Sequence, residues 1–471
     1  MKGERKKLLK AAVVSIFVFI TLFFTITKSY ASESEVILKM LLKKGIITQQ
    51  EYDQVMSEVS QKGASEEAKP KAAEAVEKHE GASPAKWVEN IQIGGSVTML
   101  GQGTSGNEDN NPPGKDTTNA SLRGNLEITT PIVEQGEAFM NLRGGVGKGL
   151  VDDEKVTSFT GVDALSGDSD GYLEINEAWY EHTFMNDKLK FTIGKVDLTA
   201  YFDGNDVAND EEIQFLSDGF VNNIAIEFPD NTIGTRLTLS PNELLDVSLG
   251  WQPGSGEWEN IFSRPFIIGE IDVKPTFGEL SGNYRLYAWT NRTDHEVIAD
   301  DMSAQSASLS AMKKRMAYTR QDEDASDTDS NGWGVGTSID QQVARFLKIF
   351  GRLGYQNEDV YPFDIAWSAG FNLKGSIWHR ENDEFALAYG IAHLSSDYKN
   401  YLTAGDINAK DEKHLEMYYN VSVNDHITIS PDIQLLMDPE GIGDKEDIWL
   451  FALRVHIMTM DWAEHRAWRQ E

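Results

Sequence analysis

The sequence predicts an all-β fold, a 16-stranded antiparallel transmembrane β-barrel preceded by a short α-helical module. Three observations lead to this prediction. Segments of about ten residues with alternating apolar and polar side chains recur from Trp87 almost to the end of the chain. The connections between these segments alternate between short and long. The chain also begins with an export signal, so its destination lies outside the cytoplasm.

The composition of the 471 residues excludes several classes of protein. Cysteine is absent, which excludes disulfides, thiolate metal sites and cysteine nucleophiles. The mean hydropathy of −0.40 excludes a bundle of membrane helices. The formal net charge of −32 argues against nucleic acid as a partner, because phosphate binding needs an excess of Lys and Arg. The same charge is compatible with a field that attracts cations.

Residues 1–31 have the features of a secretory signal peptide. Basic residues between Lys2 and Lys10 precede an apolar stretch from Ala11 to Ile26. Ser29 and Ala31 supply the small side chains that a signal peptidase recognises, so we expect cleavage after Ala31. The alternative is an uncleaved anchor helix. Because no later helical span of sufficient length follows, we expect the protein in the cell outer membrane.

Four further regions follow the signal. Residues 32–62 are expected to form a short helical module, because two apolar-periodic stretches within 33–60 are separated by Gly45 and the second opens with the capping box Thr48–Glu51. This module is a candidate for self-association or for contact with the cell wall. Residues 63–86 form an Ala/Glu/Lys-rich linker. We assign 87–460 to the barrel and 461–471 to a C-terminal extension.

The expected strands number 16, an even count. They are 90–101, 118–130, 135–147, 171–184, 188–197, 232–240, 244–252, 264–273, 282–291, 331–340, 344–355, 363–373, 384–394, 413–423, 426–435 and 447–458. Even-numbered connections such as 131–134 and 424–425 are short, whereas odd-numbered ones such as 198–231 and 292–330 are long. Outer-membrane barrels have short periplasmic turns and long outer loops. Residues 220–228 resemble a further strand but would break this parity, so we leave them in a loop.

The hairpin 415–438 illustrates the two faces of each strand. Residues such as Met417 and Ile429 alternate with polar residues such as Glu416 and Asp432. Successive strand side chains point to opposite faces. Alternation alone allows the apolar face to meet either a protein core or lipid. Because the export signal, the strand count and the loop parity favour a membrane barrel, we expect this face to contact outer-membrane lipid and the polar face to line a channel.

Several stretches resemble the carbohydrate-selective outer-membrane porins, the OprB-like family. These stretches are GKVDLTAYFDGNDVANDEEIQFLSDGFVNN (194–223), WGVGTSIDQQ (333–342), FGRLGYQNED (350–359) and YYNVSVNDHITISPDIQLLMDP (418–439). The resemblance covers most of 88–458. It implies a 16-stranded barrel and passive diffusion of carbohydrates and other small hydrophilic solutes. The segment 33–86 is an addition to the family pattern, and the loop 292–330 is enlarged.

A sugar channel needs hydrogen-bonding groups for hydroxyls and aromatic faces for the apolar side of the ring. The candidates on predicted lumen faces are Arg123, Arg143, Arg236, Arg285, Tyr287, Trp289, Lys348 and Arg352. The alternative is that the arginines pair with Glu127, Glu174 or Glu416 and hold the barrel wall together.

The loop after the fifth strand carries an acidic run that is a candidate for narrowing the pore. Its members are Asp203, Asn205, Asp206, Asp210 and Glu211. If the loop folds inward, these residues face the lumen arginines. A calcium site and a plain solvated turn are the alternatives, and the spacing is not that of an EF-hand.

The sequence gives no support for catalysis, a cofactor or a zinc site. The G-x-S-x-G match around Ser169 lies in a polar loop, whereas a nucleophile elbow needs a strand before it and a helix after it. The histidines show no zinc-binding pattern. Three alternatives to a sugar channel remain: a general or cation-preferring porin on the same fold, a barrel that mainly anchors the N-terminal module, and an outer-membrane hydrolase.

Overall fold

The computed structural model describes residues 91–107, 116–150, 156–167, 171–295, 298 and 330–459. The chain divides into two units, Met1–Gly81 and Ala82–Glu471, and all described residues belong to the second. The predicted signal peptide, helical module, linker and C-terminal extension therefore lie outside the described residues.

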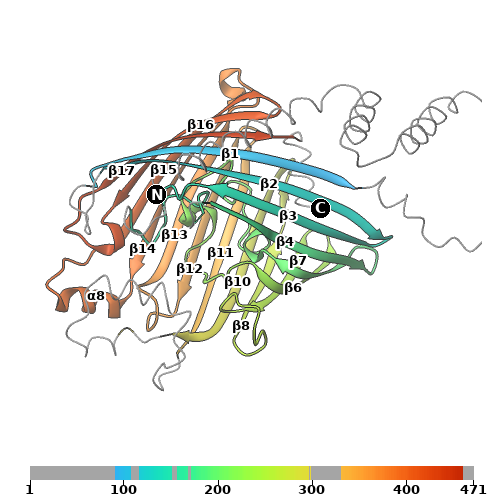
Figure 1. Cartoon of the computed structure of the whole chain (residues 1–471), viewed down its shortest axis with the longest axis horizontal. Helices are drawn as coiled ribbons and strands as arrows, with labels where there is room; N and C mark the ends of the chain where they lie inside the picture. The colour runs from blue at the N-terminus through green and yellow to red at the C-terminus, as the bar shows by residue number, and fades with distance from the viewer. Residues whose placement is uncertain are drawn as a thin grey trace, which may run out of the picture. The chain divides into compact units, whose positions relative to one another are not determined.

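The second unit is a closed antiparallel β-barrel (Figure 1). Each long strand pairs with its neighbours in the chain, and β1 pairs with both β2 and β17, which closes the sheet. Its strands are β1 (Gln92–Ser105), β2 (Thr118–Val133), β3 (Gly136–Val146), β4 (Gly171–Phe184), β5 (Leu189–Val196), β6 (Thr232–Asn242), β7 (Leu245–Pro253), β8 (Pro265–Val273), β10 (Leu280–His295), β11 (Ser330–Ala344), β12 (Leu347–Gln356), β13 (Phe363–Lys374), β14 (Glu384–Leu394), β15 (Glu412–Asn424), β16 (Ile427–Met437) and β17 (Ile448–Met458).

The two-residue strand β9 (Thr276–Phe277) pairs only with β10 and lies in the turn between β8 and β10. The barrel wall therefore has 16 strands, and the predicted 16-stranded antiparallel barrel is confirmed. The stretch 220–228 is not a strand. The chain there forms the end of the short helix α5 (Asp218–Val221) and a loop.

Some predicted turns are displaced. The turn expected at 424–425 is at 425–426, because β15 ends at Asn424 and β16 begins at Ile427. We expected the chain to turn at 341–343, but β11 continues to Ala344 and the turn is at 345–346. A bulge between Gln342 and Ala344 shifts the register, so the strand keeps pairing beyond the point where strict alternation ends. Strand β10 likewise extends to His295 after a register shift past Asn291.

The two faces of the wall differ as the alternation predicts. On β15 and β16 the polar residues Glu416, Asp432 and Gln434 point inward and are buried. On β17, Phe451 and Leu453 point outward and are 50% and 52% exposed. The exposed apolar residues of the outer face include Leu126, Ile193, Leu249, Ile271, Leu286, Leu353 and Trp449. A band of this kind is what a membrane-spanning barrel presents to lipid.

The helices lie in the connections. Besides α5 they are the 3-10 turns η1 (Leu198–Ala200), η2 (Gly375–Trp378) and η3 (Pro439–Gly441) and the helix α8 (Ser396–Ala404). The Ser395 side chain caps α8 by accepting from the Tyr398 N–H at 3.3 Å, and Tyr398 and Leu402 bury its apolar side. Within the described part of the chain, no helix is long and apolar enough to cross a membrane.

Candidate functional site

The connection between β5 and β6, residues 197–231, folds into the barrel. We call it the first inward segment. Asp197 starts it by capping η1, since its carboxylate accepts from the Thr199 N–H at 3.0 Å. Phe202 then packs with Phe266 and Ile268 on β8, and Phe215 packs with Phe350 on β12 and Tyr418 on β15. Because these strands lie on different sides of the barrel, the segment crosses the lumen.

A buried ion pair fixes the start of this segment. The Asp203 carboxylate lies 2.9 Å from Nε of Arg352, and both side chains are almost completely buried. Arg352 also donates to the backbone oxygens of Phe220 at 2.7 Å and Asp203 at 2.8 Å. The Asp203 N–H donates to Glu270 on β8 at 2.8 Å. Asp203 therefore connects β8 and β12 to the two ends of the segment.

The rest of the acidic run spreads over the wall. Lys348 on β12 donates to Asp206 at 2.6 Å, and Asn205 donates to Ser338 on β11 at 3.2 Å. Asp210 accepts from the Glu212 N–H at 2.9 Å and shapes the local turn. On the other side of the lumen, Glu211 forms an ion pair with Arg123 on β2.

This dispersal does not favour the calcium alternative. The carboxylates of Asp203, Asp206 and Glu211 each go to a different cation of the wall instead of converging on one point. Among the described residues there is no group of three or more His, Asp or Glu side chains placed to hold a metal ion. Ser169 of the G-x-S-x-G match lies outside the described residues.

The remaining candidate arginines pair along the wall. Arg285 lies 2.8 Å from Asp340 and 3.4 Å from Asp272. Arg236 donates to Glu181 at 2.6 Å and stacks over the Tyr201 ring at 3.9 Å.

Arg143 is half-buried, and its Nε donates to Asn125 at 3.0 Å. The carboxylates that pair with Arg123, Arg236 and Arg285 are thus not the Glu127, Glu174 and Glu416 named in the alternative. Glu416 instead accepts from backbone N–H groups of the first inward segment.

Tyr287 and Trp289, which we predicted to line the channel, lie beneath the first inward segment. Both point inward but are only 2% and 4% exposed, because the first inward segment covers them. They pack in a cluster with Phe202, Ile226 and Phe266, and Trp289 Nε1 donates to the Ala225 oxygen at 2.9 Å. Periodicity identified the face of the strand and could not identify the loop that covers it.

A second segment also folds inward, and we did not predict this from the sequence. Residues 156–167, between β3 and β4, form the second inward segment. Val156 and Val162 pack with Leu436 and Leu450 on the wall, and Leu165 packs with Leu100. Ser166 Oγ donates to Ser121 on β2 at 2.6 Å. The signal in the sequence was the apolar periodicity of Val156, Phe159, Val162 and Leu165 in a connection that we treated only as a long loop.

Comparison with models of known protein families identifies the family of this chain. The model of the carbohydrate-selective porin OprB family matches residues 116–458. The chain belongs to the OprB family. The matched range includes β2 to β17 and both inward segments.

Individual relatives of this OprB-family chain are distant. Porin AaxA of Chlamydia trachomatis serovar L2 is 20% identical over 288 residues, which cover 59% of this chain and 54% of the relative. Porin B of Pseudomonas aeruginosa is 22% identical over 231 residues, 45% of this chain and 44% of the relative. The chain thus spans about half the length of the curated relatives it matches.

A solved structure supports the same fold. The high-pH structure of Pseudomonas putida OprB has a TM-score of 0.63 and 16% identity, and the match covers 79% of this chain and 95% of that chain. At this identity the likeness shows the fold alone, a closed β-barrel. The exposed apolar band on the outer face is accordingly the surface that contacts outer-membrane lipid.

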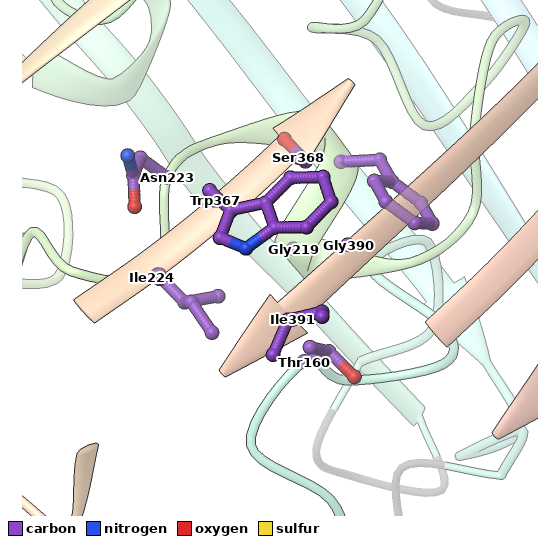
Figure 2. A pocket seen from close by; sticks show the side chains of 10 residues that line it. Thr160, Gly219, Asn223, Ile224, Trp367, Ser368, Gly390 and Ile391 are labelled. Atoms are coloured by element: carbon purple, nitrogen blue, oxygen red, sulfur yellow. The ribbon is translucent and has the colours of Figure 1, made fainter. Parts of the chain in front are cut away.

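The interior of this OprB-family barrel is closely packed where the inward segments meet the wall. A cavity of about 10 Å³ remains beside β13 and β14, lined by residues that include Thr160, Gly219, Asn223 and Ser368 (Figure 2). This volume is about what one water molecule needs. The cavity is far too small for a sugar, so it is not a candidate binding site.

Proposed function

We propose that this protein is an outer-membrane channel through which carbohydrates and other small hydrophilic solutes diffuse passively into the periplasm. The observation that carries the proposal is the first inward segment, which crosses the lumen and is fixed to β2, β8, β12 and β15 by charged and polar contacts. Such a segment narrows the path that a solute takes through the barrel and places acidic and basic side chains beside that path. Passive diffusion of this kind needs no energy source, and flux follows the solute gradient.

We assign the narrowing of the pore to Asp203, Asn205, Asp206, Asp210 and Glu211. Their wall partners Arg123, Lys348 and Arg352 fix the position of the segment and set a field of both signs across the lumen. Arg143 and Arg236 are the wall arginines that we assign to solute hydroxyls. Arg143 is half-buried, and its described contact uses only Nε. Many weak contacts of this kind suit a channel, because tight binding would slow release.

Residues outside the described barrel complete the proposal. Residues 1–31 act as a signal peptide cut after Ala31, and 32–62 form a helical module joined by the linker 63–86. The module contacts the cell wall or a second copy of the chain. Deleting 33–86 should leave conductance unchanged and alter envelope integrity or oligomeric state. Unchanged integrity and assembly would contradict a role for the module.

Liposome swelling and single-channel recording test the function. Purified protein in liposomes should admit monosaccharides faster than amino acids of the same size. Adding a sugar during single-channel recording should cause brief current blocks, since a solute in transit displaces ions. Equal swelling rates for sugars and size-matched amino acids would overturn carbohydrate selectivity.

A cation-preferring porin is the second candidate. The net charge of −32 favours it, because an acidic protein concentrates cations at its openings. A reversal potential measured across a salt gradient decides between the two. A strong cation preference without discrimination among neutral solutes would select the second candidate.

A further inference from the structure

Three alternate residues of β15 form a polar row inside the barrel. Glu412, His414 and Glu416 are each 0% exposed. Residues two apart on a strand share a face, so the three side chains lie in line along the lumen wall. We call them the β15 row.

Glu412 holds the second inward segment. The Phe159 N–H donates to its two oxygens at 3.0 and 2.9 Å, the Thr160 N–H at 2.8 Å and Thr160 Oγ1 at 2.7 Å. The Glu440 N–H of η3 adds a further bond at 2.7 Å. A carboxylate offers about four lone-pair sites, and these donors occupy them. The acceptor positions of the Glu412 carboxylate are therefore filled by donors from Phe159, Thr160 and Glu440.

Glu416 holds the first inward segment in the same way. Its two oxygens accept from the N–H groups of Leu216 and Ser217, the latter at 3.0 Å. Bonds from backbone N–H groups to a carboxylate are charge-assisted and stronger than neutral ones. One strand thus holds a backbone turn from each segment, four residues apart.

The two segments also hold each other. Ser217 Oγ donates to the Thr160 oxygen at 2.9 Å, and the Gly219 N–H donates to the same oxygen at 2.7 Å. The Ala164 N–H donates to the Leu216 oxygen at 2.7 Å. His414 Nδ1 lies 3.0 Å from Thr160 Oγ1 and 3.2 Å from Ser217 Oγ, between the two glutamates.

We propose that the two inward segments form one restriction and that Glu412 is the positioning residue that sets the size limit of the channel. The β15 row fixes both segments, and the Thr160–Ser217 contact joins them. Without Glu412, the second segment loses its charged attachment to the wall and withdraws from the lumen. The proposal rests on the protein being a channel, and it does not depend on which solutes the channel prefers.

The first test compares two glutamine variants. Glu412→Gln keeps the size of the side chain but replaces an acceptor oxygen with an NH₂ group that faces backbone donors. Its single-channel conductance should rise by about a third or more, and liposomes should admit trisaccharides that the wild type excludes. Glu384→Gln on β14 is the matched control, because Glu384 accepts from Asn372 of the neighbouring strand. The control should behave as wild type. Wild-type conductance and size limit in a folded Glu412→Gln barrel would overturn the proposal.

A second variant keeps the proposal testable if Glu412→Gln does not fold. The chain has no cysteine, so Thr160→Cys/Ser217→Cys introduces a single thiol pair. The reduced pair lacks both the Ser217 Oγ bond to Thr160 and the Thr160 Oγ1 bond to Glu412, so reduction loosens the segments from each other and from β15. The oxidised form should conduct as wild type, and reduction should raise conductance and the size limit reversibly. If mass spectrometry confirms the disulfide but conductance is the same before and after its reduction, the proposal is overturned. If liposome swelling shows no preference for sugars but conductance still responds to reduction, only carbohydrate selectivity is contradicted, and the proposed restriction stands.

Discussion

Asp203 shows how strongly the barrel interior constrains a single residue. Its backbone has φ 57°, a conformation that residues with a side chain rarely adopt. Such a conformation persists only when the surroundings fix it. Here the surroundings are Arg352, Glu270 and the Asn223 N–H, which donates to the carboxylate at 2.7 Å. The strain thus occurs where the first inward segment leaves β5.

The Asp203–Arg352 pair should contribute strongly to stability. Arg352→Met leaves the Asp203 carboxylate buried without its cation, which costs about 3–5 kcal/mol in the free energy of unfolding. The matched control is Arg345→Met, because Arg345 and its partner Glu279 are 84% and 78% exposed. An exposed pair contributes about 0–1 kcal/mol. Denaturant unfolding of the purified barrels measures both changes, and equal losses would contradict the prediction.

The limits of sequence reasoning are clearest at Tyr287 and Trp289. Alternation along β10 correctly points both side chains inward. Their environment depends on Phe202 and Ile226, which are distant in the sequence and reach them only because the first inward segment crosses the lumen. The pairing of Arg123 with Glu211 depends on the same path. Local patterns therefore predict the face of a residue, and contacts between distant segments decide what covers it.

At the scale of elements, strands were predictable and the inward segments only in part. Strands β4 and β14 have the predicted bounds, although a bulge at Asn176 interrupts the pairing of β4 with β3. The acidic run pointed to the first inward segment. The second was missed because its apolar side chains pack on Leu436 and Leu450, about 280 residues further along the chain.

The turn between β13 and β14 gives a pH-dependent prediction. Burial alone would raise the pKa of Asp383, but donation from Arg380, from the Tyr419 hydroxyl and from the Ser422 N–H lowers the pKa below its usual value. The stability that this carboxylate contributes is therefore present above the unfolded pKa of about 3.9 and is lost as pH falls through the lower folded value. The thermal unfolding temperature of wild type should fall below pH about 4.

Asp383→Asn provides the comparison for this turn. The variant should be less stable than wild type at neutral pH, and the difference should shrink as pH falls below about 4. A difference that stays constant from pH 7 to pH 3 would contradict the assignment to Asp383.

The outer face of β17 allows a test of which side of the barrel wall faces lipid. Leu453 is 52% exposed at the middle of the strand, whereas Val423 is 54% exposed beside the turn after β15. Leu453→Arg should destabilise the folded barrel by about 2–4 kcal/mol, and Val423→Arg by about 0–1 kcal/mol, because the cost of charge depends on depth in the membrane. Equilibrium unfolding in lipid vesicles measures both. Similar costs at the two positions would contradict the assignment of this face to lipid.

At the scale of the whole molecule, the interior behaves as one packed body joined to the wall at several places. The first inward segment is fixed at Arg352 on β12, and the second at Glu412 on β15. These two sites share no direct contact among those described above. They are connected through Thr160 and Ser217, where the segments meet.

This connection predicts that the two sites are energetically coupled. Changes at distant, independent sites add, whereas sites linked through a shared packed unit show interaction energies of about 0.5–3 kcal/mol. The Arg352→Met/Glu412→Gln double variant should therefore lose less unfolding free energy than the two single variants together, since releasing one segment already loosens the other. Arg345→Met combined with Glu412→Gln is the control and should be additive. Additivity in both cycles would mean that the two segments attach to the wall independently.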